Sequence, residues 1–321
     1  MKYVVVVMAA DFGVRVSLCG GVDWSGLAIK SVEKLANFLN ISSFMVSFVV
    51  LGLFTSIGEL SVGINALIEQ DPEIYVGSLI GASIVLFLLI TPLLAVMGKS
   101  IRINEKFRGF NLVASLLVVA LPAILVMDGK VSKTDGVIAV VAFVWLLRRL
   151  KSKKNLLGKI KSLGMRSSIQ VGKEVFIILL GMGIVFVASK FIVEQTLYFS
   201  DLLNISPFII SLLVVSIGTN VPELSLVFRS VAMRNYQVAF GNYVGSAAFN
   251  TLLFGVLTLI YSQDVYLSNS YVVGLVFLIA GLAMFYYFAR TENTLSRLEG
   301  LMLLTFYVVF VIAEISFHRG G

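Results

Sequence analysis

The sequence has few of the residues from which most catalytic and metal centres are built. It contains one cysteine, Cys19, and one histidine, His318. A single cysteine excludes an internal disulfide, and a single histidine near the end of the chain excludes a histidine-based metal site. The sequence also lacks a Gly-x-x-x-x-Gly-Lys phosphate-binding loop and any Ser, His or Cys constellation that resembles a catalytic site. We therefore expect neither an enzyme nor a bound cofactor.

Charged residues are also scarce. They make up 13% of the 321 residues, whereas hydrophobic residues make up 58%, and the mean hydropathy is +0.97. This composition excludes a soluble domain and is typical of a polytopic membrane protein. Several apolar runs approach the ~20 residues that a helix needs to cross a bilayer. They cover residues 10–36, 42–68, 74–98, 109–127, 134–150, 172–198, 206–232, 236–262, 267–289 and 299–317.

The apolar runs favour helices over strands. They lack the period-2 alternation and turn spacing of a membrane β-barrel, whereas a helix satisfies its backbone hydrogen bonds within one segment. The first run resembles a signal peptide, but Asp11 and Arg15 interrupt its apolar core and no clear cleavage pattern follows. We therefore keep it in the mature chain and predict an all-α polytopic membrane protein with about ten transmembrane helices.

The net charge of +7 is concentrated in alternate loops, which argues against nucleic acid as a partner. The basic residues between the fifth and sixth runs place that segment in the cytoplasm by the positive-inside rule. The loop after the second run instead carries Glu69, Asp71 and Glu73. This pattern predicts a multi-pass protein of the cell membrane, with both termini outside and a cytoplasmic linker at residues 151–166.

The chain aligns to itself at an offset of 164 residues, which superposes Glu59 on Glu223. Both lie mid-run, in the strings Thr-Ser-Ile-Gly-Glu-Leu-Ser (55–61) and Thr-Asn-Val-Pro-Glu-Leu-Ser (219–225). Internal repeats in membrane proteins mark the elements that enclose a binding site near the bilayer midplane. With five runs in each half, the second half enters the membrane in the opposite direction. We therefore predict two inverted five-helix repeats.

The repeats divide the chain into three parts. The first repeat covers residues 1–150, with its central motif at 51–91, and the second covers 167–321, with its motif at 215–255. The basic linker at 151–166 connects them and is too short for a folded regulatory domain. An amphipathic helix along the membrane surface is one interpretation of this linker.

Glu59 and Glu223 are candidate site residues because a carboxylate at bilayer depth costs roughly 3 kcal/mol or more. On a helix, Thr55 and Ser56 share a face with Glu59, which gathers hydroxyl and carboxylate oxygens. Two opposed buried carboxylates repel, so each would take up a proton unless a cation bridged them. Hard oxygen ligands suit Ca²⁺, and Na⁺ could use the same oxygens.

A second motif in each repeat places glycines four residues apart, at Gly77 and Gly81 and again at Gly241 and Gly245. This spacing permits close helix packing, which is the interpretation we favour for the glycines. Ser246 and Asn250, one helical turn apart, add oxygens to one face, and we expect these two to be ligands.

These strings resemble the two alpha repeats of the cation/Ca²⁺ antiporter superfamily, and most of all its archaeal sodium/calcium exchangers. The resemblance covers nearly the whole chain and implies a ten-helix exchanger in which Ca²⁺ and Na⁺ alternate at overlapping midplane sites. It also implies that the first and sixth helices slide across the other eight. It implies a set of ion-binding residues: Glu59 and Glu223 as shared carboxylates, Thr55 and Thr219 as main-chain oxygen donors, Ser56 and Ser246 as Na⁺ ligands, Asn220 at a further Na⁺ site, and Asn250 at the polar position of the eighth helix.

The first repeat departs from the family pattern at several positions. Phe54 replaces Gly, Gly58 replaces Pro, Ser78 replaces Asn, Ala82 replaces a ligand Ser, and Leu86 replaces a polar residue. In the second repeat, Asn220 stands where Ser is usual. Because Ala82 and Asn220 both fall at the expected outward Na⁺ site, these departures bear on Na⁺ coupling rather than on Ca²⁺ binding.

These observations are compatible with three functional hypotheses. The leading hypothesis is a secondary antiporter that exchanges Ca²⁺ for Na⁺ by alternating access and works as a monomer in the lipid bilayer. The alternative keeps the fold but couples Ca²⁺ to protons or another cation. The third is a transport-inactive membrane scaffold with a degenerate first repeat, although the retained Glu59 argues against it.

Overall fold

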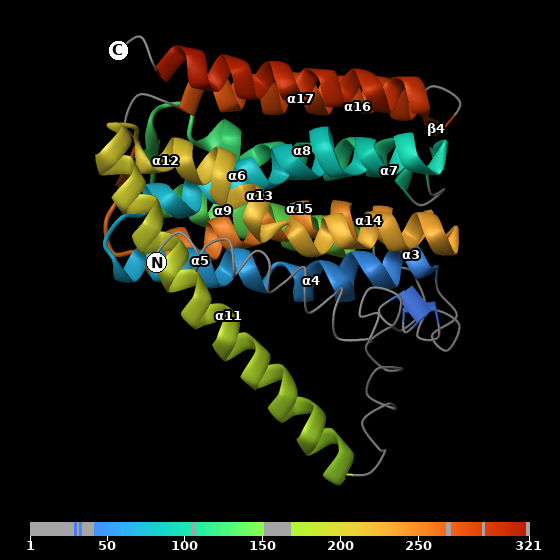
Figure 1. Cartoon of the computed structure of the whole chain (residues 1–321), viewed down its shortest axis with the longest axis horizontal. Coiled ribbons are helices and arrows are strands. Elements are labelled where there is room, and N and C mark those ends of the chain that lie inside the picture. Colours follow the sequence, from blue (N-terminus) through green and yellow to red (C-terminus); the bar gives the residue numbers. More distant parts are fainter. Residues whose placement is uncertain are drawn as a thin grey trace.

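The computed structural model describes residues 29–30, 32–33, 42–103, 107–150, 168–267, 271–290 and 293–318, with side chains in the sixth expected span from residue 186. Most of the first expected span, including Asp11 and Arg15, and the linker at 151–166 lie outside the described residues. Apart from the connecting loops and four short strands, the described part is helical (Figure 1). The predicted all-α membrane fold is therefore confirmed.

In the first half, each expected span from residue 42 onward coincides with a helix or with consecutive helical segments. The span at 42–68 is built from four segments: α3 (Ser43–Val46), η1 (Ser47–Leu51), α4 (Gly52–Thr55) and α5 (Ile57–Ile68). The next is continuous through three: α6 (Glu73–Ile84), η2 (Val85–Ile90) and α7 (Thr91–Gly98). The last two spans are α8 (Phe110–Leu125) and α9 (Lys133–Leu150).

The second half repeats this order. It begins with α11 (Ser168–Leu203) and continues through α12 (Pro207–Ile210), η4 (Ser211–Val215), α13 (Ser216–Thr219), α14 (Val221–Met233), α15 (Tyr236–Ile260), α16 (Tyr271–Arg290) and α17 (Arg297–His318). Among the described residues, five helices are long and apolar enough to cross a membrane, or six if the bent α12–α14 run is one span. The total of ten spans stays a prediction.

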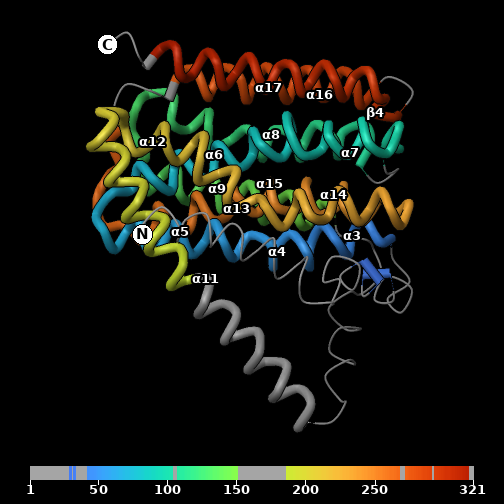
Figure 2. The backbone as a smooth tube through the Cα atoms, in the orientation of Figure 1, coloured from blue at the N-terminus to red at the C-terminus, as the bar shows by residue number. Residues whose placement is uncertain are grey.

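Most helices lie with their axes roughly aligned, whereas α11 crosses them at a slant (Figure 2). α11 contacts α5, and the side-chain amide of Asn65 on α5 donates to Ser189 Oγ at 2.7 Å and to the Phe186 carbonyl at 3.2 Å. These bonds satisfy a polar side chain that is otherwise buried among apolar helices. They also tie α11 to the rest of the molecule.

The glycine motifs pack as predicted. At each of the four glycines, an added Cβ would overlap a backbone carbonyl group of a helix from the other half, so only a glycine fits. The contacts are Gly77 with Phe208, Gly81 with Leu212, Gly241 with Phe44, and Gly245 with Phe48. All four obey the offset of 164 residues. Thus α6 packs on α12 and η4 of the second half in the way that α15 packs on α3 and η1 of the first.

Four short strands form two antiparallel pairs that the sequence analysis did not anticipate. β1 (Ser100–Arg102) pairs with β4 (Thr294–Ser296), and β2 (Lys130–Val131) pairs with β3 (Val265–Tyr266). Shifted by 164 residues, β1 overlaps β3 and β2 falls within β4. The two pairs are therefore equivalent parts of the repeat and join loops that are distant in the sequence.

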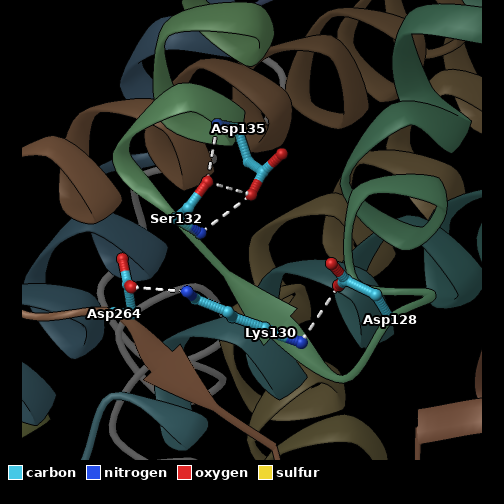
Figure 3. Close-up of polar contacts among 5 residues, drawn as sticks. All are labelled: Asp128, Lys130, Ser132, Asp135 and Asp264. Atoms are coloured by element: carbon cyan, nitrogen blue, oxygen red, sulfur yellow. Dashed lines mark hydrogen bonds and ion pairs between the residues drawn. The ribbon is translucent and has the colours of Figure 1, made fainter.

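The helices that follow β2 and β4 are each capped at their start by side-chain hydrogen bonds, which Figure 3 shows for α9. Ser132 Oγ and backbone N–H donate to Asp135 Oδ2 at 2.6 and 2.8 Å, and the Asp135 N–H donates back to Ser132 Oγ at 3.4 Å. Ser296 and Glu299 form the same reciprocal cap at the start of α17. Such a capping box satisfies backbone donors that a helix leaves unpaired. Its repetition at the offset of 164 residues is a further mark of the duplication.

Candidate cation site

Both carboxylates stand just after a one-residue break in a helix. Ser56 (φ −75°, ψ 3°) separates α4 from α5, and Asn220 (φ −94°, ψ 12°) separates α13 from α14. Glu59 and Glu223 lie in the first turns of the helices that follow. The start of a helix has unpaired N–H groups and a partial positive charge, both of which stabilise a carboxylate.

The two breaks differ in sharpness. A π-helical segment precedes each one, η1 in the first half and η4 in the second, and such segments are frequent at functional sites. In the second half, the helix axis bends by 41° between Thr219 and Val221, whereas α3 to α5 count as one continuous span. Pro222 has no N–H with which to continue the preceding helix, and Gly58 stands in its place in the first half.

The two carboxylates are buried and interact with each other. Glu59 is 2% exposed and Glu223 is 0% exposed, and Glu223 acts electrostatically on Glu59. Within the described part of the chain, Oε2 of each has no hydrogen-bond partner. Burying two like charges with unpaired oxygens is costly unless a cation or protons neutralise them. The structure therefore brings Glu59 and Glu223 together as the inverted repeat predicts.

Thr55 and Thr219 each lie against the opposite half of the molecule. Thr55 Oγ1 lies 2.8 Å from Ser246 Oγ, and Ser246 Oγ donates to Glu223 Oε1 at 3.3 Å. On the other side, a Cβ added at Gly58 would lie 3.9 Å from the Thr219 Cβ, so Thr219 stands beside the turn of α5 that carries Glu59. The first half thus reaches Glu223 through the Thr55 and Ser246 hydroxyls, and the second half places Thr219 next to the turn of Glu59. Sequence analysis had placed the Thr55 hydroxyl on the face of Glu59, and the family resemblance implied main-chain oxygens from both threonines; the contact of Thr55 with Ser246 was not expected.

Ser56 and Asn220 make the same local bond at the two breaks. Ser56 Oγ donates to the Gly52 carbonyl at 2.8 Å, and Asn220 Nδ2 donates to the Ser216 carbonyl at 2.7 Å. The buried Oδ1 of Asn220 has no partner among the described residues. Asn220 thus keeps a free oxygen acceptor, whereas the hydroxyl proton of Ser56 is used within its own helix.

α15 supplies a row of polar side chains beside the carboxylates. Asn250 is buried, and neither its Oδ1 nor its Nδ2 has a partner within the residues that the structure describes. Sequence reasoning missed Asn242, whose Oδ1 lies 3.4 Å from Thr55 Oγ1. The spacing of four residues from Asn242 to Ser246 to Asn250 was the signal that could have revealed it. Tyr243 OH, also missed, donates to the Glu223 carbonyl at 3.1 Å.

The corresponding face of α6 is poorer in oxygen. Ala82 and Leu86, the counterparts of Ser246 and Asn250, are both buried and apolar. Ser78, the counterpart of Asn242, keeps a buried hydroxyl whose oxygen has no partner in the described structure. Across the described residues, no cluster of three or more Asp, Glu, His or Cys side chains exists that could hold a metal. A cation here would rely on two carboxylates together with neutral oxygens.

A family model described as sodium/calcium exchanger protein matches residues 12–149 and 173–315. The chain belongs to this family. Its sequence is 25% identical over 331 residues to the sodium/calcium exchanger MaX1 of Methanosarcina acetivorans, covering 91% of this chain and 94% of the relative. It is 28% identical over 292 residues to an uncharacterized membrane protein of Methanocaldococcus jannaschii, covering 91% and 92%.

The fold is similar to that of a solved exchanger. The structure of the sodium-calcium exchanger NCX_Mj, soaked with Na⁺ and Sr²⁺, superposes with a TM-score of 0.69 at 22% sequence identity. The match covers 96% of this chain and 98% of that one. The predicted family and the predicted exchanger-like fold are therefore confirmed.

Proposed function

We propose that the protein is a secondary antiporter that exchanges Ca²⁺ for Na⁺ across the cell membrane by alternating access. The observation that carries this proposal is the pair of buried carboxylates, Glu59 and Glu223, at equivalent helix breaks with an unpaired oxygen on each. Two negative charges at bilayer depth match one divalent cation or two monovalent ones. An exchanger binds one divalent cation and the monovalent cations in turn at such a site.

Ca²⁺ takes six to eight oxygens, so the carboxylates need help from neutral groups. Main-chain oxygens of Thr55 and Thr219 lie beside them in the sequence pattern. Ser56, Asn220, Ser246 and Asn250 would complete overlapping Na⁺ sites. The family membership and the name of the relative MaX1 support Na⁺ as the exchanged ion.

Ion flux into proteoliposomes tests the proposal. We expect ⁴⁵Ca²⁺ uptake to follow an imposed outward Na⁺ gradient and to ignore K⁺ and pH gradients imposed separately. Glu59→Gln and Glu223→Gln should abolish the uptake. Glu314→Gln is a matched control because it removes another buried carboxylate, from α17. Uptake that is indifferent to Na⁺ would contradict Na⁺ coupling.

A second candidate is a Ca²⁺/H⁺ antiporter with the same fold. Ala82 and Leu86 give α6 no side-chain oxygen at two positions where α15 has one. The first half therefore offers few ligands for Na⁺, while two carboxylates can carry protons. Ca²⁺ uptake driven by a pH gradient in the absence of Na⁺ would favour this candidate. An inactive scaffold would show neither flux nor thermal stabilisation by any cation.

We also propose the orientation predicted from loop charge, with both termini outside and residues 151–166 in the cytoplasm between two five-helix repeats. Single cysteines introduced into a Cys19→Ala background at Lys130 and at Arg234 provide the test. A membrane-impermeant maleimide applied to intact cells should label the first and spare the second. We expect a monomer as the working unit, which cross-linking in the membrane would check.

A further inference from the structure

A hollow of about 220 Å³ lies where α8 begins and α16 ends, at the edge of the membrane helices. It is lined by Arg108, Gly109, Leu112, Tyr286, Ala289, Arg290 and Asn293. Two of these residues are arginines, and none of the described lining residues is acidic. The hollow shares no residue with the cation site, and the charge of its loops predicts the cytoplasmic side.

The backbone around the hollow is fixed by the strand pair β1–β4. The Ile103 N–H donates to the Asn293 carbonyl at 2.9 Å, and Arg108 Nε donates to the Ile103 carbonyl at 3.1 Å. Arg108 is thereby held against the loop that carries Asn293. On α16, Tyr286 and Arg290 are one turn apart and face the same side. The two arginines thus approach the hollow from different elements.

The start of α8 adds donors to the same place. Gly109 precedes the helix with a positive φ of 54°, has open space where a Cβ would stand, and provides no side-chain cap. The N-terminus of a helix favours anions, and here the Asn111 N–H donates to the Arg108 carbonyl at 3.2 Å, which fixes this turn next to Arg108. The side chains of Leu112 and Ala289 are apolar and buried. The hollow therefore combines two arginines and a helix N-terminus with a short apolar surface.

The internal duplication provides a control for this arrangement. The same frame exists at the other end of the molecule, where the Leu267 N–H donates to the Gly129 carbonyl at 2.9 Å and Gly129, like Asn293, has a positive φ. The counterparts of Arg108 and Arg290 at the offset of 164 residues are Val272 and Val126. The fold therefore forms this corner without arginines, and their presence at one end calls for a separate reason.

We propose that the Arg108–Arg290 hollow binds a phosphate-bearing anion, and that its place at the membrane edge suits the headgroup of an anionic phospholipid. Guanidinium groups bind phosphate oxygens with paired N–H donors. Basic pockets between membrane helices on the cytoplasmic side are typical sites for anionic headgroups. Tyr286 and Asn293 add polar groups, and the apolar wall suits the start of the acyl chains of a lipid.

Thermal unfolding in nanodiscs tests the proposal without a transport assay. Phosphatidylglycerol added to phosphatidylcholine should raise the melting temperature of the wild-type protein by several degrees. The Arg108→Gln/Arg290→Gln variant should lose most of this rise. Arg297→Gln, which removes an exposed arginine at the nearby start of α17, should keep it. An equal rise in the double variant, or an equal loss in Arg297→Gln, would mean that the lipid senses only general surface charge and would overturn the proposal.

A second arm distinguishes a lipid from a soluble ligand. Inorganic phosphate or glycerol 3-phosphate is added to protein in pure phosphatidylcholine, against potassium chloride of matched ionic strength. An arginine-dependent rise here would support the phosphate site and assign it to a soluble anion. No rise with either source would overturn the proposal.

A third measurement uses only wild-type protein, so it holds even if the variants fold poorly. Phenylglyoxal modifies accessible arginines, and mass spectrometry reports each site. Phosphatidylglycerol should slow modification of Arg108 and Arg290 several-fold while leaving Arg297 unchanged. Equal slowing at all three arginines, or none at any, would contradict a specific pocket.

Discussion

α6 and α15 occupy equivalent places in the two halves, and the backbone contacts of one repeat those of the other. Gly81 touches the Leu212 carbonyl as Gly245 touches the Phe48 carbonyl. Yet α15 carries Ser246 and Asn250 beside the carboxylates, where α6 carries Ala82 and Leu86. Close packing leaves no freedom at the glycines, whereas positions one residue and five residues further along the same helices have diverged. The proposed cation site is therefore symmetric in its backbone frame and asymmetric in the side chains that we propose as ligands.

The largest effect should come from the carboxylates, where the halves are alike. Glu59→Gln and Glu223→Gln each remove one charge from the buried pair and leave the other without its counterpart for a divalent ion. A loss of about 3 kcal/mol in Ca²⁺ binding corresponds to about 100-fold. Isothermal titration calorimetry and ⁴⁵Ca²⁺ flux would measure it. If one variant retained Ca²⁺ binding, the site would rest on one half only.

The next largest effect should come from the polar side chains that α15 has and α6 lacks. Ser246→Ala removes the hydroxyl that links Thr55 to Glu223, and we expect about tenfold weaker Na⁺ competition, near 1.4 kcal/mol. Ala82→Ser restores the missing hydroxyl to the first half and should strengthen Na⁺ competition. Competition against ⁴⁵Ca²⁺ binding gives both values. Ser83→Ala is the matched control because Ser83 Oγ bonds the Leu79 carbonyl of its own helix. Unchanged competition in Ala82→Ser would show that this difference does not limit Na⁺.

The packing glycines should respond equally in the two halves. Gly81→Ala and Gly245→Ala each force a Cβ against a backbone carbonyl, which should lower stability by about 1–3 kcal/mol. Gly218→Ala, where an added Cβ meets nothing within 4 Å, should be neutral or slightly stabilising. Melting temperatures in detergent would compare the three. Unequal losses at Gly81 and Gly245 would mean that the two helix contacts differ in tightness.

The smallest effect should appear at Asp71, whose counterpart in the second half is Asn235. Their N–H groups make equivalent bonds, to the Ala66 and Ser230 carbonyls, each at 3.0 Å. Burial, with a further contribution from the charge of Glu73, raises the pKa of Asp71 from 3.8 to about 6. The ionised form is thus disfavoured in the folded protein, so stability falls as pH rises from about 4 to 6.

Asp71→Asn should remove that loss. We expect a gain of at most about 1 kcal/mol above pH 6, reduced because Asp71 is only partly buried, and no gain below pH 4. Melting temperatures across this pH range would measure it. A gain that persisted at low pH would contradict an electrostatic cause.

Periodicity and duplication were sufficient to predict the helices, the pairing of Glu59 with Glu223 and the packing role of the glycines. The residues that sequence reasoning missed depend on contacts between distant segments. Asn242 joins the site because α15 lies against α4, and the strand pairs form between loops more than 130 residues apart. Strands of two or three residues have no periodic signal. The contacts of Thr55 and Thr219 with the opposite half likewise depend on how the halves dock.

The contact of Thr219 with the opposite half has a consequence for biosynthesis. Thr219, which stands beside the turn that carries Glu59, is translated 160 residues after Glu59. At 5–20 residues per second, this interval lasts roughly 8 to 32 s. During that time the first half has Glu59 at bilayer depth without this neighbour. We therefore expect the nascent first half to stay close to the insertion machinery, or to water, until the second half arrives. A ribosome stalled near residue 150 would capture this waiting intermediate.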